Sequence, residues 1–259
     1  MAEVLEQEVR DGVLYLWINR PEVMNAINPD VLKTLHEKLD AARNDAEVRT
    51  VVLSGRGRAF CAGQELNPAL LGGGVKVREM VLTMYNPVIE AMKNLQKPII
   101  ASVNGAAVGA GLSLALAADL RIASVEASFS MAFGKIGLAP DSGASYYLPR
   151  LVGLSKAMEW ALFGTMVDAN TALASGLVND VVAADKLAEE THRIAAALAK
   201  GPTVALGLTK RALYEGVSGA LADALEREAL YQQLASETHD FREGVGAFQQ
   251  KRAPKFLGK

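Results

Sequence analysis

The chain has 259 residues, of which 27 are Lys or Arg and 29 are Asp or Glu, so its formal net charge is −2. This balance argues against nucleic acid or an anionic membrane as a partner, because both attract concentrated positive charge. Half of the residues are hydrophobic, as in a globular chain of one or two domains with a sizeable core. The single cysteine, Cys61, excludes a disulfide framework and a multi-cysteine metal site, and predicts a reducing compartment, the cytoplasm.

No targeting or membrane segment is expected. The first ten residues are acidic and lack the basic-then-apolar pattern of a secretory signal, which predicts that the mature chain starts at Met1. The longest stretch without a charge, 98–118, contains three glycines together with Ser102, Asn104 and Ser113. This stretch indicates a buried strand, a turn and a buried helix rather than a membrane span.

The elements of the first half alternate between strand and helix. A helix is expected over 30–46, where Val31, Leu35 and Leu39 lie on one face. Short apolar or β-branched runs bounded by Gly, Asn, Pro or charge predict buried strands at 13–18, 50–53 and 99–103. This alternation predicts an α/β fold.

The chain becomes wholly helical from Asp185, which is expected to cap a helix that ends at 200–202, a Lys-Gly-Pro stop signal. Two further helices are expected over 203–213 and 220–235. The domain prediction is therefore an α/β core over 1–200 and a helical oligomerisation region over 201–259. Periodicity alone leaves open whether this tail packs on a neighbouring subunit or on its own core. We find no internal repeat in the sequence.

The sequence lacks the motifs of several common kinds of metal-binding and catalytic site. His36, His192 and His239 are far apart and lie outside any zinc-binding pattern, so no metal site is predicted. The chain lacks the GxSxG elbow of hydrolases and the GxxxxGK[ST] loop of nucleotide hydrolases. Leu114 stands where a dinucleotide-binding fingerprint needs its last small residue, which argues against NAD chemistry.

Two glycine-containing segments follow predicted strands, at 58–66 and at 104–113. Small residues there let the backbone approach a ligand closely, and the first amides of a helix lack internal partners. One amide from each loop could stabilise an oxyanion that develops on a carbonyl group. The alternative for either loop alone is tight packing of helix against sheet.

A third segment, 137–145, contains the turn Pro140-Asp141-Ser142-Gly143. Locally, Asp141 is best explained as a helix cap. The functional alternative is a general acid or base whose pKa is raised by apolar neighbours such as Phe133, Ile136 and Leu138.

Together the three segments resemble the enoyl-CoA hydratase/isomerase (crotonase) superfamily. The resemblance rests on Phe60-Cys61-Ala62-Gly63-Gln64-Glu65-Leu66, on the block 104–114, and on 138–143 followed by 149–153. It covers nearly the whole chain. It implies an α/β spiral of ββα units with a helical C-terminal trimerisation region, a homotrimer or dimer of trimers, and acyl-CoA thioester substrates. No cofactor is implied, because CoA is part of the substrate.

The resemblance also assigns roles to individual residues. It implies that the backbone amides of Gln64 and Ala110 form an oxyanion hole and that Asp141 is the catalytic carboxylate. Phe248 and Lys251 match positions through which a neighbouring subunit touches the adenosine end of CoA. The full set of implied substrate- and CoA-binding residues is Asn25, Ala26, Ala62, Gln64, Glu65, Ala110, Ser113, Phe133, Phe248 and Lys251.

Hydratases of this family carry two glutamates, and those positions are Ser113 and Phe133 here. A single remaining carboxylate, Asp141, suits isomerisation better than water addition. The segments around Met131, Asp141 and the C-terminus are similar to the ring-1,2-epoxyphenylacetyl-CoA isomerase branch, in which the epoxide becomes an oxepin during phenylacetate breakdown. Glu65 and the pair Ala144-Ser145 depart from the commoner Asp and Gly-Thr.

Two alternatives stay open. The first is a Δ3,Δ2-enoyl-CoA isomerase that acts on aliphatic chains, because the glycine-rich loop 68–76, expected to line the acyl pocket, does not reveal the acyl group. The second is a non-catalytic homologue that binds RNA or protein. The lack of a long Lys/Arg stripe argues against RNA.

Overall fold

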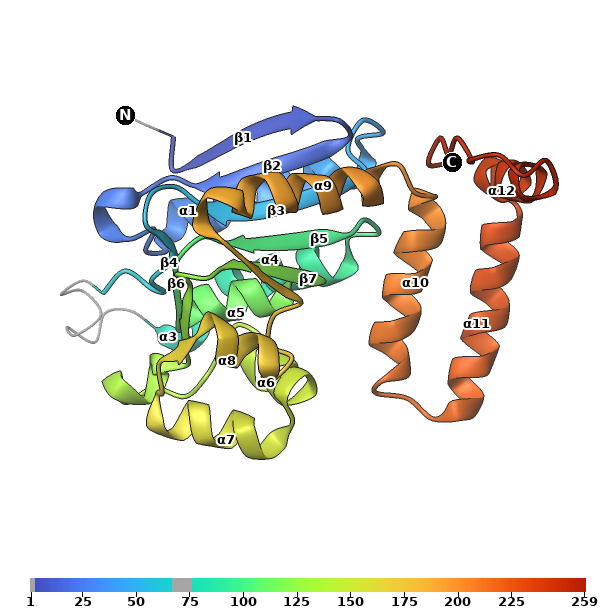
Figure 1. Cartoon of the computed structure of the whole chain (residues 1–259). Helices are drawn as coiled ribbons and strands as arrows, with labels where there is room; N and C mark the ends of the chain where they lie inside the picture. The colour runs from blue at the N-terminus through green and yellow to red at the C-terminus, as the bar shows by residue number, and fades with distance from the viewer. Residues whose placement is uncertain (1–2, 67–75) are drawn as a thin grey trace.

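The computed structural model describes residues 3–66 and 76–259, which form a body with two sheets and a helical tail (Figure 1). Within the described residues the larger sheet has the order β1-β2-β3-β5-β7-β10, and all neighbours are parallel except β1 and β2. Its strands are β1 (Leu5–Arg10), β2 (Val13–Ile18), β3 (Thr50–Gly55), β5 (Ile99–Val103), β7 (Leu120–Ser124) and β10 (Asp180–Val182). The expected strands at 13–18 and 99–103 are confirmed, and β3 extends two residues beyond the prediction.

A second sheet of short strands has the order β4-β6-β8-β9. These strands are β4 (Ala59–Cys61), β6 (Ala106–Val108), β8 (Ser128–Ser130) and β9 (Val167–Asp168). The chain repeatedly passes from a strand of the large sheet to a strand of the small sheet and then to a helix, as in β5, β6 and α5 (Ala110–Ala117). The predicted α/β architecture of ββα units is confirmed, although the sequence carries no detectable repeat.

Helices cover the two sheets. The predicted helix at 30–46 is α1 (Pro29–Asn44), and its cap is Asn28, whose side chain accepts the Val31 N–H at 3.0 Å. As expected, Val31, Leu35 and Leu39 are buried. The other helices of the body are α3 (Val77–Met80), α4 (Asn86–Asn94), α6 (Ala144–Val152), α7 (Leu154–Phe163), α8 (Ala169–Ala174) and α9 (Leu187–Ala199).

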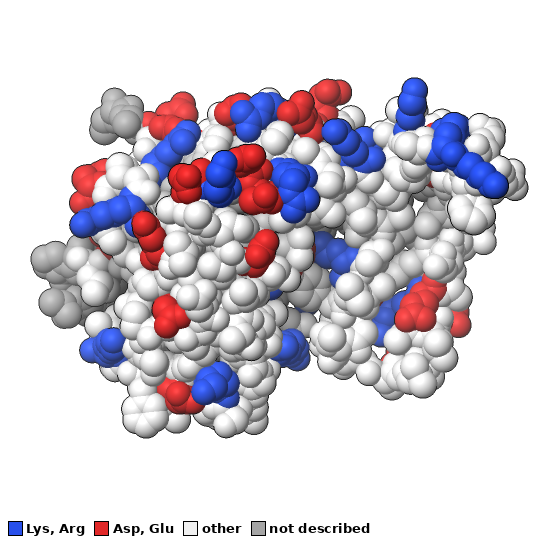
Figure 2. All heavy atoms as spheres, in the orientation of Figure 1, with Lys and Arg blue, Asp and Glu red and all other residues white. Residues whose placement is uncertain are grey.

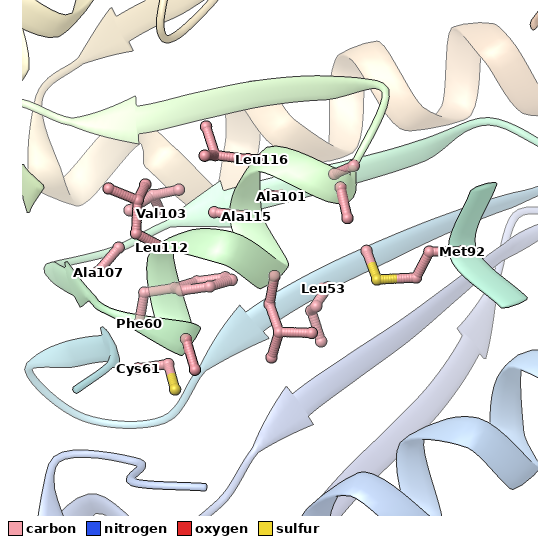
Figure 3. Packing of buried hydrophobic residues seen from close by; sticks show 14 of the residues in the cluster. Leu53, Phe60, Cys61, Met92, Ala101, Val103, Ala107, Leu112, Ala115 and Leu116 are labelled. Atoms are coloured by element: carbon pink, nitrogen blue, oxygen red, sulfur yellow. The ribbon is translucent and has the colours of Figure 1, made fainter. Parts of the chain in front are cut away.

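The core forms where the two sheets and α5 meet. Phe60 and Cys61 of β4 lie beside Ala107 of β6 and Leu112 of α5 (Figure 3). Every residue of α5 is buried, so the buried helix predicted within the uncharged stretch 98–118 is confirmed. The stretch holds two strands, β5 and β6, where one was predicted. Among the helices of the described residues, none is both long and apolar enough to cross a membrane.

The C-terminal tail consists of α10 (Thr203–Gly216), α11 (Leu221–Ser236) and α12 (His239–Gln249), which lie to one side of the body (Figure 1). The first two helices match their predicted ranges, and α12 lies in the region 201–259 that is predicted to be helical without a range of its own. The predicted cap at Asp185 is wrong, because this residue lies in a 3-10 turn and no side chain caps α9. Helix α9 itself packs on β3, β5 and β7, so it belongs to the body.

Candidate active site

The first loop of the site leaves β4 at Cys61 and continues through Gly63 and Gln64. Ile27 holds this loop on both sides of Gln64, because its N–H donates to the Gly63 carbonyl at 2.7 Å and its carbonyl accepts the Glu65 N–H at 2.8 Å. The Ala62 N–H donates to the Met24 carbonyl at 3.0 Å. The Gln64 peptide is therefore fixed by a neighbouring segment that lies far away in the sequence.

The second loop leaves β6 and opens α5 at Ala110. It lies so close to the first loop that only glycine fits at two positions. A Cβ on Gly63, whose φ is +95°, would lie 2.8 Å from the Val108 carbonyl oxygen, and a Cβ on Gly111 would lie 2.2 Å from that of Cys61. The same Gly63 position is 3.6 Å from the Ala110 nitrogen. The structure thus brings the Gln64 and Ala110 backbones together.

The amides of Gln64 and Ala110 have no hydrogen-bond acceptor among the described residues. Within residues 3–66 and 76–259, neither N–H donates a hydrogen bond to a backbone or side-chain acceptor. Ala110 is the first residue of α5, where the N–H groups lack internal partners and the helix dipole favours negative charge. Two such donors can stabilise an oxyanion on a thioester carbonyl.

Asp141 lies in the turn before α6 and is half-buried. Helix α6 begins at Ala144 without a side-chain cap, so the local interpretation of Asp141 as a capping side chain is wrong. Its main-chain carbonyl accepts the Ala144 N–H instead, at 3.0 Å. The carboxylate accepts a hydrogen bond from the Ser142 hydroxyl at 2.8 Å. Burial raises the pKa of Asp141, and the Ser142 hydrogen bond opposes that rise.

Ser113 connects the acidic turn to the second loop. Its fully buried hydroxyl lies 3.3 Å from the Gly109 carbonyl oxygen and 3.2 Å from that of Asp141. Phe133 is also buried, in a 3-10 turn over Ala132–Ile136. The two positions where family hydratases carry glutamates thus hold a hydroxyl directed at backbone carbonyls and an aromatic ring.

The segment 25–26 was expected to help hold CoA, and it lies against the first loop. The Asn25 side chain is fully engaged, accepting the Arg20 N–H at 2.9 Å and donating to the Arg56 and Ala59 carbonyls at 2.8 and 2.7 Å. Arg20 donates to the Ala26 carbonyl at 2.7 Å and pairs with both oxygens of Glu65, at 2.9 and 3.2 Å. The side chains of Asn25 and Glu65 therefore hold the loop in shape.

Phe248 and Lys251 do not join this site within one chain. They lie on and just after α12, on the opposite side of the molecule from β4 and β6 (Figure 1). The predicted loop 68–76 falls, except for Lys76, outside the described residues. The interaction of Phe248 and Lys251 with a neighbouring subunit's ligand stays a prediction.

Sequence reasoning missed two residues that support the site. Arg20 anchors the first loop through Ala26 and Glu65, and Tyr85 donates from its phenol to the Gln64 side-chain oxygen. Neither residue belongs to a glycine-rich motif. Tyr85 is the last residue of a π-helical turn, Val81–Tyr85, and contacts Gln64 from there. No spacing in the sequence indicates that contact.

The chain is similar to known proteins over most of its length. The family model described as enoyl-CoA hydratase/isomerase matches residues 8–259. The 1,2-epoxyphenylacetyl-CoA isomerase of Escherichia coli strain K12 is 41% identical over the full length of both chains. The trans-2-decenoyl-[acyl-carrier-protein] isomerase of Streptococcus mutans is 33% identical over 97% of each chain.

Solved structures agree on the fold. The enoyl-CoA hydratase of Bacillus anthracis superposes with a TM-score of 0.93 at 32% identity, covering 99% of this chain and all of that one. The crotonase-like fold expected from the sequence is therefore confirmed. The chain belongs to the enoyl-CoA hydratase/isomerase family and is an enzyme with that family's activity on acyl-CoA.

Proposed function

We propose that the protein isomerises an acyl-CoA thioester without a cofactor, and that its substrate is the ring epoxide 2-(1,2-epoxy-1,2-dihydrophenyl)acetyl-CoA, which it converts to the oxepin in phenylacetate catabolism. The observation that carries this proposal is the pairing of one half-buried carboxylate, Asp141, with two available amides. The full-length similarity to the Escherichia coli isomerase supports the choice of substrate.

The proposed mechanism needs a donor pair and a base. The N–H groups of Gln64 and Ala110 bind the thioester oxygen and stabilise the enolate that forms when a proton leaves the adjacent carbon. For the ring epoxide, the carbon–carbon bond shared by the epoxide and the six-membered ring breaks, and its electrons become part of the double bonds of the seven-membered oxepin ring. The carboxylate of Asp141 accepts the proton and returns it to a ring carbon conjugated with the enolate, so the same group acts as base and then as acid. Atoms balance without an added reactant, as an isomerisation requires.

Water addition has less support at this site. A hydratase organises water between two carboxylates, and here the matching positions are Ser113, whose hydroxyl faces backbone carbonyls, and Phe133. We therefore expect negligible hydration of short 2-enoyl-CoA substrates.

The second candidate is a Δ3,Δ2-enoyl-CoA isomerase acting on aliphatic chains. The same amide pair and carboxylate would move the double bond, and the similarity to an isomerase of decenoyl thioesters favours this alternative specifically. RNA binding has no comparable support, because it needs a surface on which basic side chains are concentrated. On the face that Figure 2 shows, basic and acidic side chains are intermingled.

The deciding experiment compares three substrates with the purified protein. The ring epoxide, an aliphatic 3-enoyl-CoA and a 2-enoyl-CoA report epoxide isomerisation, double-bond migration and hydration respectively. Turnover of the ring epoxide well above that of the aliphatic substrate is the expected result. The reverse order would assign the protein to the second candidate, and hydration at rates typical of a hydratase would contradict both.

The oligomer is part of the same proposal. The tail assembles a homotrimer or a dimer of trimers, and Phe248 and Lys251 complete the CoA site of a neighbouring subunit. Two features support this: Phe248 is 85% exposed, and a hollow of about 540 Å³ between the tail helices is lined by apolar side chains that include Phe241, Val245 and Phe256. Solution mass measurement tests it, and a monomer that binds acyl-CoA with full affinity would refute it.

A further inference from the structure

Tyr85 is a buried phenol directed at the loop that carries one of the two proposed oxyanion donors. The side chain is 1% exposed, and its O–H donates to the side-chain oxygen of Gln64. The Gln64 side-chain nitrogen in turn donates to the Glu65 carbonyl at 3.1 Å. Both polar ends of the Gln64 side chain are therefore engaged, one by Tyr85 and one by the backbone of its own loop.

The backbone around Tyr85 is arranged to place this phenol. Residues 77–94 form consecutive helical segments, α3, the π-helical turn Val81–Tyr85 and α4. A π-helical turn is rare, and it shifts the register of the side chains that follow it. Tyr85 is the buried residue of this turn, so the irregularity coincides with the position that contacts the site.

The surroundings of Tyr85 favour its protonated form, which donates hydrogen bonds. Burial raises its pKa strongly, and the negative charge of Asp141 raises it further. The phenol therefore lies near Asp141 as well as near the loop that carries Gln64.

We propose that Tyr85 is a positioning residue that aligns the Gln64 backbone amide with the substrate carbonyl by holding the Gln64 side chain. This inference rests on the proposed function, because it requires that the Gln64 amide bind the thioester oxygen. Ile27 fixes the peptides on either side of Gln64. Tyr85 adds a third attachment, through the side chain, which restricts rotation of the Gln64 peptide toward or away from the ligand.

The test uses Tyr85→Phe, which removes only the hydroxyl. We expect kcat for the isomerisation to fall about tenfold, as for the loss of one ordinary hydrogen bond, with KM changed less than twofold. Gln64→Met removes the acceptor from the other side and keeps the backbone amide, so it tests the same contact should Tyr85→Phe fold poorly. Gln64→Met also removes the hydrogen bond to the Glu65 carbonyl. The double variant is therefore expected to lose no more than Gln64→Met alone, because the contact with Tyr85 is already absent there.

A second measurement reads the oxyanion donors without turnover. Isotope-edited infrared spectroscopy of bound hexanoyl-CoA, labelled with ¹³C at the thioester carbonyl, reports how strongly the carbonyl is polarised. We expect a downward shift of the C=O stretch in the wild-type protein and a smaller one in Tyr85→Phe. Tyr15→Phe is the matched control, since Tyr15 is also buried and donates to or accepts from His192 at 2.6 Å, in a separate part of the core.

The outcomes separate the two proposals. An equal carbonyl shift and equal kcat in wild type and Tyr85→Phe would overturn the positioning role while leaving the oxyanion site intact. Losses that multiply in the double variant would also overturn it, because Tyr85 would then act independently of Gln64. A wild-type protein that leaves the carbonyl unpolarised would overturn the oxyanion site itself, and with it the role of Tyr85.

Discussion

Helix α5 of the body and helix α11 of the tail treat their apolar residues in opposite ways. In the body, all eight residues of α5 are buried. In the tail, Tyr231 is the buried residue of α11, whereas Leu221, Leu225 and Leu230 are 74%, 55% and 54% exposed. Burying a leucine side chain is worth about 1.5–3 kcal/mol, so covering these residues would stabilise the tail. Helix α5 completes the core of the body, whereas α11 leaves its leucines exposed.

The site lies in the body and should depend most on Asp141. Asp141→Asn keeps the shape of the side chain and an acceptor for Ser142 but removes the base. We expect turnover to fall about a hundred- to ten-thousandfold, the usual contribution of a general acid or base. Acyl-CoA binding and thermal stability should be preserved, which calorimetry and thermal unfolding would check. Near wild-type turnover would make Asp141 structural and direct attention to Ser113 or Glu65.

The junction between body and tail contains a largely buried ion pair. Lys210 of α10 lies 2.9 Å from Asp119, and its side chain is 6% exposed. Because Lys210→Met leaves the carboxylate without its partner, we expect unfolding free energy to fall by about 3 kcal/mol, measured by denaturant titration. Lys156→Met, which breaks an exposed pair with Glu159, is the control and should have little effect. Equal effects would show that solvent screens both pairs alike.

Glycines in the two regions should respond differently to one added methyl group. Gly111→Ala would place a Cβ 2.2 Å from the Cys61 carbonyl oxygen, so we expect a loss of about 1–3 kcal/mol in stability. Gly246 of α12 has nothing within 4 Å of that position, and Gly246→Ala should stabilise the helix by about 1 kcal/mol. Thermal unfolding of both variants measures the contrast. Destabilisation by Gly246→Ala would indicate that a partner already packs against α12.

The smallest expected effect concerns pH. In the proposed mechanism the base form of Asp141 is the active one, so turnover should rise with pH through its pKa, which burial places above the ordinary value for aspartate. Ser142→Ala removes the hydrogen bond that favours the ionised form. The pKa should therefore rise further, and the acid limb of the kcat/KM profile should move to higher pH. A limb that stays in place would mean that another group controls it.

Local sequence determined much of this protein. The strands at 13–18 and 99–103 and the helices α10 and α11 follow from short apolar patterns and stop signals, which act over a few residues. Glycine and small residues at the strand exits likewise marked the two loops of the site. Resemblance to a known family supplied the remaining predictions, and the match of the family model over residues 8–259 confirms the family.

Tertiary structure decided what those residues do. Asp141 is locally a plausible cap, yet α6 starts without it, and the carboxylate accepts a hydrogen bond from Ser142 instead. Asn25 matches a CoA-binding position, yet all its side-chain hydrogen bonds serve the loop. The contact between Tyr85 and Gln64 depends on a π-helical turn and on the packing of that turn against the loop that carries Gln64. Such contacts are selected by packing across the whole chain, so no short pattern in the sequence encodes them.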